Sequence, residues 1–168
     1  MIKIDVNSKY FYVMGILKIA KDLGVSVSAT KLQKLVFLIE IELNFNLGYE
    51  FIPYYFGPFS KELQDDVYRL KNLGYVEVKK EAVEDFVSGA IIGFKKAYKI
   101  SDKVTFDFSS LDKNFVEFVV THLKIPLDDL LKYVYVKYPE YTVNSVIKDR
   151  VFKAKFSCPS LLNFFWNI

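Results

Sequence analysis

The chain has 168 residues, of which 52% are hydrophobic, 17% aromatic and 26% charged, and its formal net charge is +3. This length and composition predict one folded domain, residues 1–168, and exclude an intrinsically disordered chain. The isoelectric point near 8.7 falls short of the strongly basic value typical of a dedicated nucleic-acid binder. The single cysteine, Cys158, cannot form an intramolecular disulfide, and no apolar run approaches the roughly 18 residues of a membrane span. We therefore expect a cytoplasmic protein that does not enter a membrane.

Hydrophobic periodicity predicts two helices at the start of the chain, with a short strand between them. The first helix covers residues 8–23, where apolar side chains recur at three- and four-residue spacing. The strand is expected at residues 25–27. The second helix is expected to begin at Thr30, which forms a capping-box pattern with Gln33. Because this second helix is apolar nearly all round, it should be the central helix of the fold.

The next segment, residues 46–60, is a long connection rich in glycine, proline and aromatic residues. Gly57 and Pro58 within it are typical of a rigid turn. Ser60 is a good N-cap, and it predicts a third helix over residues 61–73. A connection of this length needs some side chains that pack inward and hold it against the rest of the chain.

Four aromatic rings surround that turn. Strand-like alternation through residues 54–56 would point Tyr55 away from its two neighbours. We therefore expect Tyr54 and Phe56 in the core, and Tyr55 with Phe59 on a surface that contacts a partner. Burial of all four rings in the core is the alternative.

The order of the predicted elements indicates a fold class. The remaining elements are two strands, at residues 75–79 and 91–100, and three helices, at residues 110–123, 126–138 and 142–152. The first part of the chain follows the order of a winged helix, which is helix, short strand, helix, connection, helix and hairpin. The connection is longer here than the tight turn of a DNA-reading helix-turn-helix. We predict a mainly α protein with a small β wing. It consists of an elaborated winged-helix-like scaffold over residues 8–104 and a helical C-terminal extension over residues 109–168.

Several motifs resemble known families. LKNLGYVEV at residues 70–78, followed by YKISDK at 98–103, resembles the wing of many winged-helix regulators. Three other segments resemble the YwgA-like family of small archaeal and bacterial proteins: TKLQKLVFLIE (30–40), YYFGPFSKELQDDV (54–67) and YVKYPEYTVNSVIKDRV (135–151). The first two of these segments are also similar to the Panacea domain, an antitoxin domain related to the SocA adaptor. The Panacea resemblance implies a protein that neutralises a toxic partner or presents a partner to a protease.

The sequence shows no constellation of side chains typical of catalysis. His122 is the only histidine and has no second histidine or cysteine at metal-ligand spacing, so we interpret it as a packed helix histidine. Cys158 lies in an apolar tail without a nearby histidine, which is typical of an inert thiol. Adjacent carboxylates such as Asp65 and Asp66 point about 100° apart on a helix, and we interpret them as solvated side chains or as charges in the first turn of a helix. We therefore predict no enzymatic activity, no catalytic residue, no cofactor and no metal.

A winged-helix DNA-binding transcriptional regulator is the alternative function. The third predicted helix, which would enter the major groove, carries as many acidic as basic side chains: Lys61, Arg69 and Lys71 against Glu62, Asp65 and Asp66. The predicted wing offers five lysines that could contact phosphates: Lys79, Lys80, Lys95, Lys96 and Lys99. Acidic residues between these lysines nearly cancel their charge, which favours a solvated hairpin over a nucleic-acid-binding one.

Protein recognition is the preferred function. In the predicted helix 126–138, Tyr133 and Val136 lie away from the main apolar stripe, so this helix is either packed on two sides or presents a patch. The apolar tail, residues 156–168, packs on the same chain or on a second subunit, and the second case would give a homodimer. We predict a non-enzymatic binding module of antitoxin or adaptor type that contacts a protein partner through Tyr55, Phe59, Tyr133 and Val136.

Overall fold

The computed structural model describes residues 8–84, 88, 90–105 and 107–153. Along these residues the elements are α1 (Lys9–Asp22), β1 (Val27–Ser28), α2 (Ala29–Ile41), β2 (Ile52–Tyr54), β3 (Gly57–Phe59), α3 (Lys61–Asn72), β4 (Val76–Glu84), β5 (Ile91–Ile100), α4 (Lys113–Lys124), α5 (Leu127–Lys137), the 3-10 helix η1 (Pro139–Thr142) and α6 (Lys148–Lys153). No helix in these ranges is both long and apolar enough to span a membrane. Cys158 and the predicted tail at 156–168 lie outside the described residues. The expected combination of helices with a small antiparallel sheet is confirmed.

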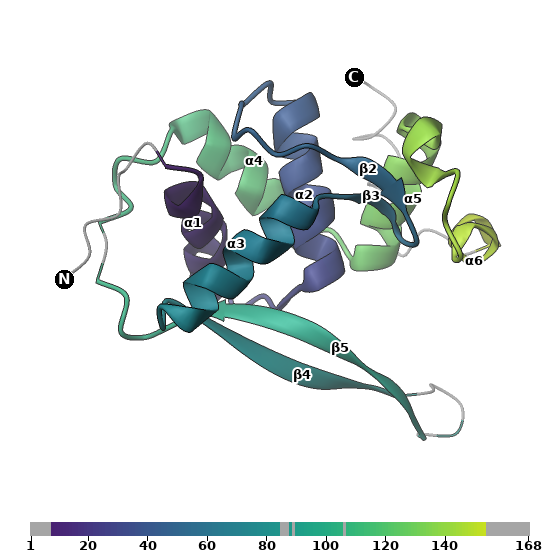
Figure 1. Cartoon of the computed structure of the whole chain (residues 1–168), viewed down its shortest axis with the longest axis horizontal. Helices are drawn as coiled ribbons and strands as arrows, with labels where there is room; N and C mark the ends of the chain where they lie inside the picture. The colour runs from purple at the N-terminus through teal and green to yellow at the C-terminus, as the bar shows by residue number, and fades with distance from the viewer. Residues whose placement is uncertain (1–7, 85–87, 89, 106, 154–168) are drawn as a thin grey trace.

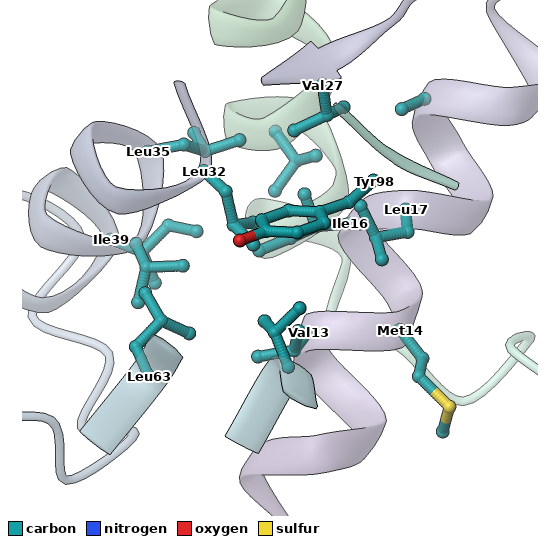
Figure 2. Close-up of a cluster of buried hydrophobic side chains, with 14 of the residues drawn as sticks. Val13, Met14, Ile16, Leu17, Val27, Leu32, Leu35, Ile39, Leu63 and Tyr98 are labelled. Carbon is teal, nitrogen blue, oxygen red and sulfur yellow. The ribbon is translucent and has the colours of Figure 1, made fainter. Parts of the chain in front are cut away.

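The central helix is α2, as its all-round apolar character predicts. One face of α2 packs against α1, α3, α4 and β5, and the Tyr98 ring of β5 lies between the side chains of α2 and α1 (Figures 1 and 2). The opposite face carries Phe37 and Leu38, which are fully buried in a second cluster that includes side chains of α5 and α6. Two hydrophobic clusters therefore share one helix, which fixes the C-terminal helices relative to the N-terminal ones.

The larger sheet consists of three antiparallel strands in the order β1-β5-β4. The long β4–β5 hairpin projects from the helices in Figure 1. Its inner end is anchored by buried Val76, Tyr98 and Ile100, with Val76 opposite Ile100 in the register. Its outer end extends past the core, so Phe94 is exposed although it lies on the same face as Tyr98. Strand β4 continues to Glu84, well beyond the predicted end at residue 79.

The N-cap of α2 differs from the prediction. Ser28, the last extended residue of β1, caps the helix, because its Oγ accepts a hydrogen bond from the Lys31 N–H at 3.1 Å. The predicted capping box of Thr30 and Gln33 is therefore wrong, since β1 leads into the helix two residues earlier. The N-cap predicted at Ser60 is confirmed, with Ser60 Oγ accepting from the Leu63 N–H at 3.3 Å.

The helix predicted at residues 142–152 is only partly formed. The structure has η1 and α6 at its two ends, and residues 143–147 between them are not helical. The backbone there turns toward the β2–β3 hairpin instead: the Val146 N–H donates to the Tyr55 carbonyl at 3.0 Å, and Asn144 Nδ2 donates to the Pro53 carbonyl at 3.2 Å. These tertiary hydrogen bonds replace the helical ones at the point where the C-terminal region supports the hairpin.

Candidate functional site

The segment PYYFGPF forms a tight hairpin. Strands β2 and β3 pair with Tyr54 opposite Gly57, so the turn consists of Tyr55 and Phe56. The turn predicted at Gly57 and Pro58 is therefore wrong, since both residues lie in β3. Gly57 has a φ of +86°, and a Cβ at this position would lie 2.9 Å from Cε1 of Tyr135. Glycine is required here both by the backbone conformation and by the close approach of that ring.

The rings of this hairpin lie on the surface. Tyr54 is 40%, Tyr55 52% and Phe56 47% exposed, and Phe59 is half-buried. The prediction that Tyr54 and Phe56 belong to the core is wrong, because the hairpin turns its proline face inward, where Pro58 is buried. Tyr54 stacks between its neighbours, with ring centroids 4.4 Å from Tyr55 and 4.9 Å from Phe59. We call Tyr54, Tyr55, Phe56 and Phe59 the aromatic tip. Tyr55 and Phe59 have the accessibility that the predicted contact surface needs, and their role in binding stays a prediction.

A cavity of about 250 Å³ lies beside the aromatic tip. It is bounded by the start of α2, the β2–β3 hairpin, α3 and β5, and its lining includes Thr30, Gln33, Lys34, Tyr54, Phe56, Phe59, Gln64, Tyr68, Lys96 and Tyr98. The two lysines are the charged side chains in this lining, and no carboxylate belongs to it. The cavity is therefore rich in aromatic rings and positive in character.

The polar residues of the KLQKL segment, residues 31–35, join α2 to other elements of the fold. Lys31 Nζ donates to the carbonyls of Leu123 and Ile125, at 2.5 and 2.8 Å, at the C-terminal end of α4. Lys34 Nζ donates to the Pro58 carbonyl at 2.8 Å. Both lysine side chains are buried, and burial lowers the pKa of both, that of Lys34 to about 7. Sequence reasoning missed these roles, although polar residues inside a helix that is apolar all round are a signal for buried hydrogen bonds.

The structure separates the two partner-contact residues predicted on α5. Tyr133 is only 5% exposed, and its hydroxyl donates to Glu42 at 2.6 Å, so the prediction that it lies on a contact surface is wrong. This tyrosine turns inward because α5 is packed on two sides and Glu42 provides a partner for its polar end. Val136 is exposed, but it does not line the cavity beside the aromatic tip.

The five wing lysines do not form one basic surface. Cross-strand register places Lys80 and Lys96 on one face of the β4–β5 hairpin and Lys79, Lys95 and Lys99 on the other. Lys95 pairs with Glu81 at 3.3 Å and Lys99 with Asp102 at 3.9 Å, while Lys96 donates to the Tyr68 hydroxyl. The lysines predicted as nucleic-acid contacts are therefore divided between two faces, and two of them are already paired with carboxylates.

Most of the charges of α3 are likewise paired within the protein. Lys61 pairs with Asp65 at 2.9 Å, and Arg69 lies 3.4 Å from Asp66. Asp66 is completely buried, which corrects its interpretation as a solvated carboxylate. It accepts hydrogen bonds from the hydroxyls of Tyr10 and Tyr49 at 3.2 and 3.1 Å. Burial, together with the negative charge of Asp66, raises the pKa of Tyr49.

His122 is packed, as the sequence predicts. Its ring stacks on Phe118 at 3.9 Å between centroids, and Nδ1 lies 2.8 Å from the Phe118 carbonyl oxygen. Burial lowers its pKa. Within the described ranges, no group of three or more His, Cys, Asp or Glu side chains is arranged to hold a metal ion.

Comparison with known proteins gives no match: neither the protein-family models nor the curated proteins include one that is similar to this chain. The resemblance to YwgA-like and Panacea proteins therefore stays a prediction, and the candidate site has to be interpreted from its own residues. Those residues are the aromatic tip and the cavity beside it.

Proposed function

We propose that this protein is a non-enzymatic binding module that recognises another protein through the aromatic tip, in the manner of an antitoxin or an adaptor. The observation that carries the proposal is the exposure of three consecutive rings, Tyr54, Tyr55 and Phe56, at the end of one hairpin. Large aromatic side chains dominate the binding energy of protein interfaces, because they bury much surface and lose little conformational entropy. Three such rings side by side on a surface favour a role in recognition.

The backbone beneath the aromatic tip is held in place. The Tyr55 carbonyl accepts hydrogen bonds from the Val146 N–H at 3.0 Å and from Ser145 Oγ at 3.3 Å. Strand β3 is joined to α2 by the hydrogen bond from Lys34 to the Pro58 carbonyl. A surface organised in advance loses less entropy on binding than a mobile loop, and this supports a binding role for the hairpin.

The scaffold that we propose for this module is an elaborated winged helix. Three helices precede the long β4–β5 hairpin, and the strand order β1-β5-β4 places the short first strand beside the returning strand of the wing. The β2–β3 hairpin is then an insertion between the second and third helices. This arrangement, together with the KLQKL and FGP motifs, supports membership of the YwgA-like and Panacea group, with antitoxin or adaptor activity as the implied role.

A DNA-binding regulator is the second candidate, favoured by the exposed lysines of the projecting wing. The internal ion pairs of α3 and the division of the wing lysines between two faces favour protein recognition instead. An uncharged recognition helix gains little from counterion release, which supplies most of the affinity in nonspecific DNA binding.

Affinity purification from the native host separates the two candidates. Three baits are compared: the wild-type chain, the single variant Tyr55→Ala, and the double variant Lys79→Glu with Lys95→Glu. Circular dichroism confirms that each variant is folded. We expect a protein to copurify with wild type and with the double lysine variant, and to be lost with Tyr55→Ala. Nucleic acid that copurifies with wild type, dissociates as salt is raised and is lost only in the lysine variant would contradict the proposal.

A further inference from the structure

The cavity beside the aromatic tip is lined by two lysine side chains and by no carboxylate. Lys34 reaches it from α2 and Lys96 from β5. In the part of the chain that the structure describes, the hydrogen-bond partner of Lys34 Nζ is the Pro58 carbonyl, and that of Lys96 Nζ is the Tyr68 hydroxyl. Both partners are uncharged, so neither amino group has a counter-charge among the described residues.

This lack of a counter-charge is costly at Lys34, which is only 2% exposed. Burying an ammonium group without an anion disfavours its charged form, and burial accordingly lowers the pKa of Lys34 to about 7. A carboxylate brought into the cavity by a ligand would compensate that charge and stabilise it. Charge complementarity therefore favours an anionic occupant.

Most of the remaining lining of the cavity is apolar. The rings of Phe56 and Phe59 line it on the hairpin side and that of Tyr68 on the α3 side. Its volume of about 250 Å³ lies below the roughly 300–1,000 Å³ of pockets that hold cofactors and drug-sized ligands. This size suits one anchoring side chain of a larger partner rather than a whole small molecule.

The cavity is also formed before any ligand binds. The Gln33 side chain joins α2 to the end of the hairpin through two hydrogen bonds with the Ser60 backbone, at 2.9 and 2.8 Å. The tight contact of Gly57 with the Tyr135 ring fixes the hairpin from below. Lys96 is held over the Tyr68 ring, with Nζ 5.2 Å from the ring centroid. These contacts position the walls and the positive charges independently of the exposed rings.

Building on the proposed function, we propose that the partner inserts an acidic peptide segment into this cavity. One apolar side chain of the segment fills the space between Phe56, Phe59 and Tyr68. A neighbouring aspartate or glutamate side chain faces the amino groups of Lys34 and Lys96. The aromatic tip then provides the broad contact, while the cavity selects partners by the combination of an apolar anchor and an adjacent carboxylate.

NMR titration of the full-length chain, enriched in nitrogen-15, tests this assignment. The probe is the acetylated and C-terminally amidated peptide Ser-Asp-Asp-Phe-Asp-Asp-Ser, compared with versions in which Asn replaces every Asp or Ala replaces Phe. We expect the acidic peptide to shift backbone resonances of α2, β3 and β5, and each replacement to weaken binding by roughly fivefold or more. A fourth peptide has only uncharged side chains but a free C-terminal carboxylate. It tests whether the end of a chain, rather than an acidic side chain, is the source of the negative charge.

Variants of the chain complete the test. Lys96→Met should weaken binding of the acidic peptide by roughly fivefold, whereas Lys79→Met, on the opposite face of the wing, should leave it unchanged. Lys34→Met should weaken binding more strongly, and the surface variant Lys96→Met keeps the test valid if the buried substitution prevents folding. Equal binding of the Asp and Asn peptides, no effect of Lys96→Met, or tighter binding of the peptide with the free carboxylate would each overturn the inference.

The two proposals fail separately. Tyr55 lies outside the cavity lining, so partner capture that depends on Tyr55 supports the proposed function whatever the peptides do. If Tyr55→Ala abolishes capture while the acidic peptide does not bind, the aromatic tip recognises its partner without an acidic anchor. If Tyr55→Ala has no effect on capture, the proposed function itself fails.

Discussion

The side-chain amide of Gln33 forms two hydrogen bonds with the backbone of Ser60: Nε2 donates to the carbonyl oxygen at 2.9 Å, and Oε1 accepts from the N–H at 2.8 Å. Both residues are buried, and Ser60 is also the N-cap of α3. One side chain of the central helix therefore fixes the end of the β2–β3 hairpin and the start of the next helix.

Replacing Gln33 tests the strength of this connection. Gln33→Ala leaves the buried Ser60 N–H without a partner, while the Ser60 carbonyl keeps its hydrogen bond from the Gln64 N–H at 3.2 Å. We expect the free energy of unfolding to fall by about 2 kcal/mol. Urea denaturation measures the change. The other glutamine of the chain, Gln64, is half-buried on α3, and Gln64→Ala is the matched control, with an expected change within about 0.5 kcal/mol. Equal losses in the two variants would show that the Gln33 amide has no special role.

The start of α2 provides a second matched pair of substitutions. Ser28→Ala removes the hydroxyl that accepts the Lys31 N–H, and we expect a loss of about 1 kcal/mol in the free energy of unfolding. Thr30→Ala, two residues later, removes a hydroxyl from inside the helix and should change stability by less than about 0.5 kcal/mol. Chemical denaturation of both variants checks the order, and a larger loss at Thr30 would restore the capping box predicted from the sequence.

Alanine substitutions at Gly57 and Gly48 distinguish the stability cost of backbone strain from that of a steric clash. Both have positive φ, +86° and +79°, but a Cβ at Gly57 meets the Tyr135 ring whereas a Cβ at Gly48 meets no atom within 4 Å. Gly48→Ala should therefore cost about 1 kcal/mol from strain alone. Gly57→Ala adds the clash, and we expect a total of about 3 kcal/mol or more, measured by thermal or urea unfolding. Similar costs at the two positions would mean that the hairpin can move away from Tyr135.

The buried amino group of Lys34 predicts how stability depends on pH. Burial lowers its pKa from the ordinary 10.5 to about 7 in the folded state. Between these values the unfolded chain holds a proton that the folded chain does not, so the free energy of unfolding rises with pH across this window. The contribution of one such group is at most about 1.4 kcal/mol per pH unit. Lys31, whose pKa burial also lowers, contributes with the same sign.

Urea denaturation at pH 7, 8 and 9 measures this slope. We expect Lys34→Met to reduce it markedly, because the substitution keeps an unbranched side chain in the site and removes the titrating group. The same substitution at exposed Lys80 controls for the loss of one positive charge. An unchanged slope in Lys34→Met would mean that the amino group keeps its proton in the folded protein.

Local signals predicted most of the regular elements. The periodic apolar residues of α1, the Ser60 cap of α3 and the alternation in β5 are encoded within a few residues, and the structure places all three close to the predicted positions. The break between η1 and α6 was not predictable in this way. Residues 143–147 leave the helical conformation to bind the backbone at Tyr55 and Pro53, which are about 90 positions away in sequence.

The candidate site was only partly predictable. The exposure of Tyr55 agrees with the alternation in the sequence, but the exposure of Tyr54 and Phe56 depends on which face of the hairpin turns inward. Nothing within PYYFGPF specifies that choice. The Lys34 hydrogen bond to Pro58 and the Tyr135 ring below Gly57 decide it, and both come from other parts of the chain.

The position of the bound partner tests the central claim most directly. A photo-crosslinking amino acid, p-benzoylphenylalanine, is introduced in place of Tyr55 in one variant and in place of Lys79 in another, and the host extract is irradiated with each. We predict a crosslinked protein partner from position 55, on the aromatic tip, and none from position 79, on the face of the wing that carries Lys95 and Lys99. Crosslinking from position 79 alone, to nucleic acid or to protein, would contradict the account.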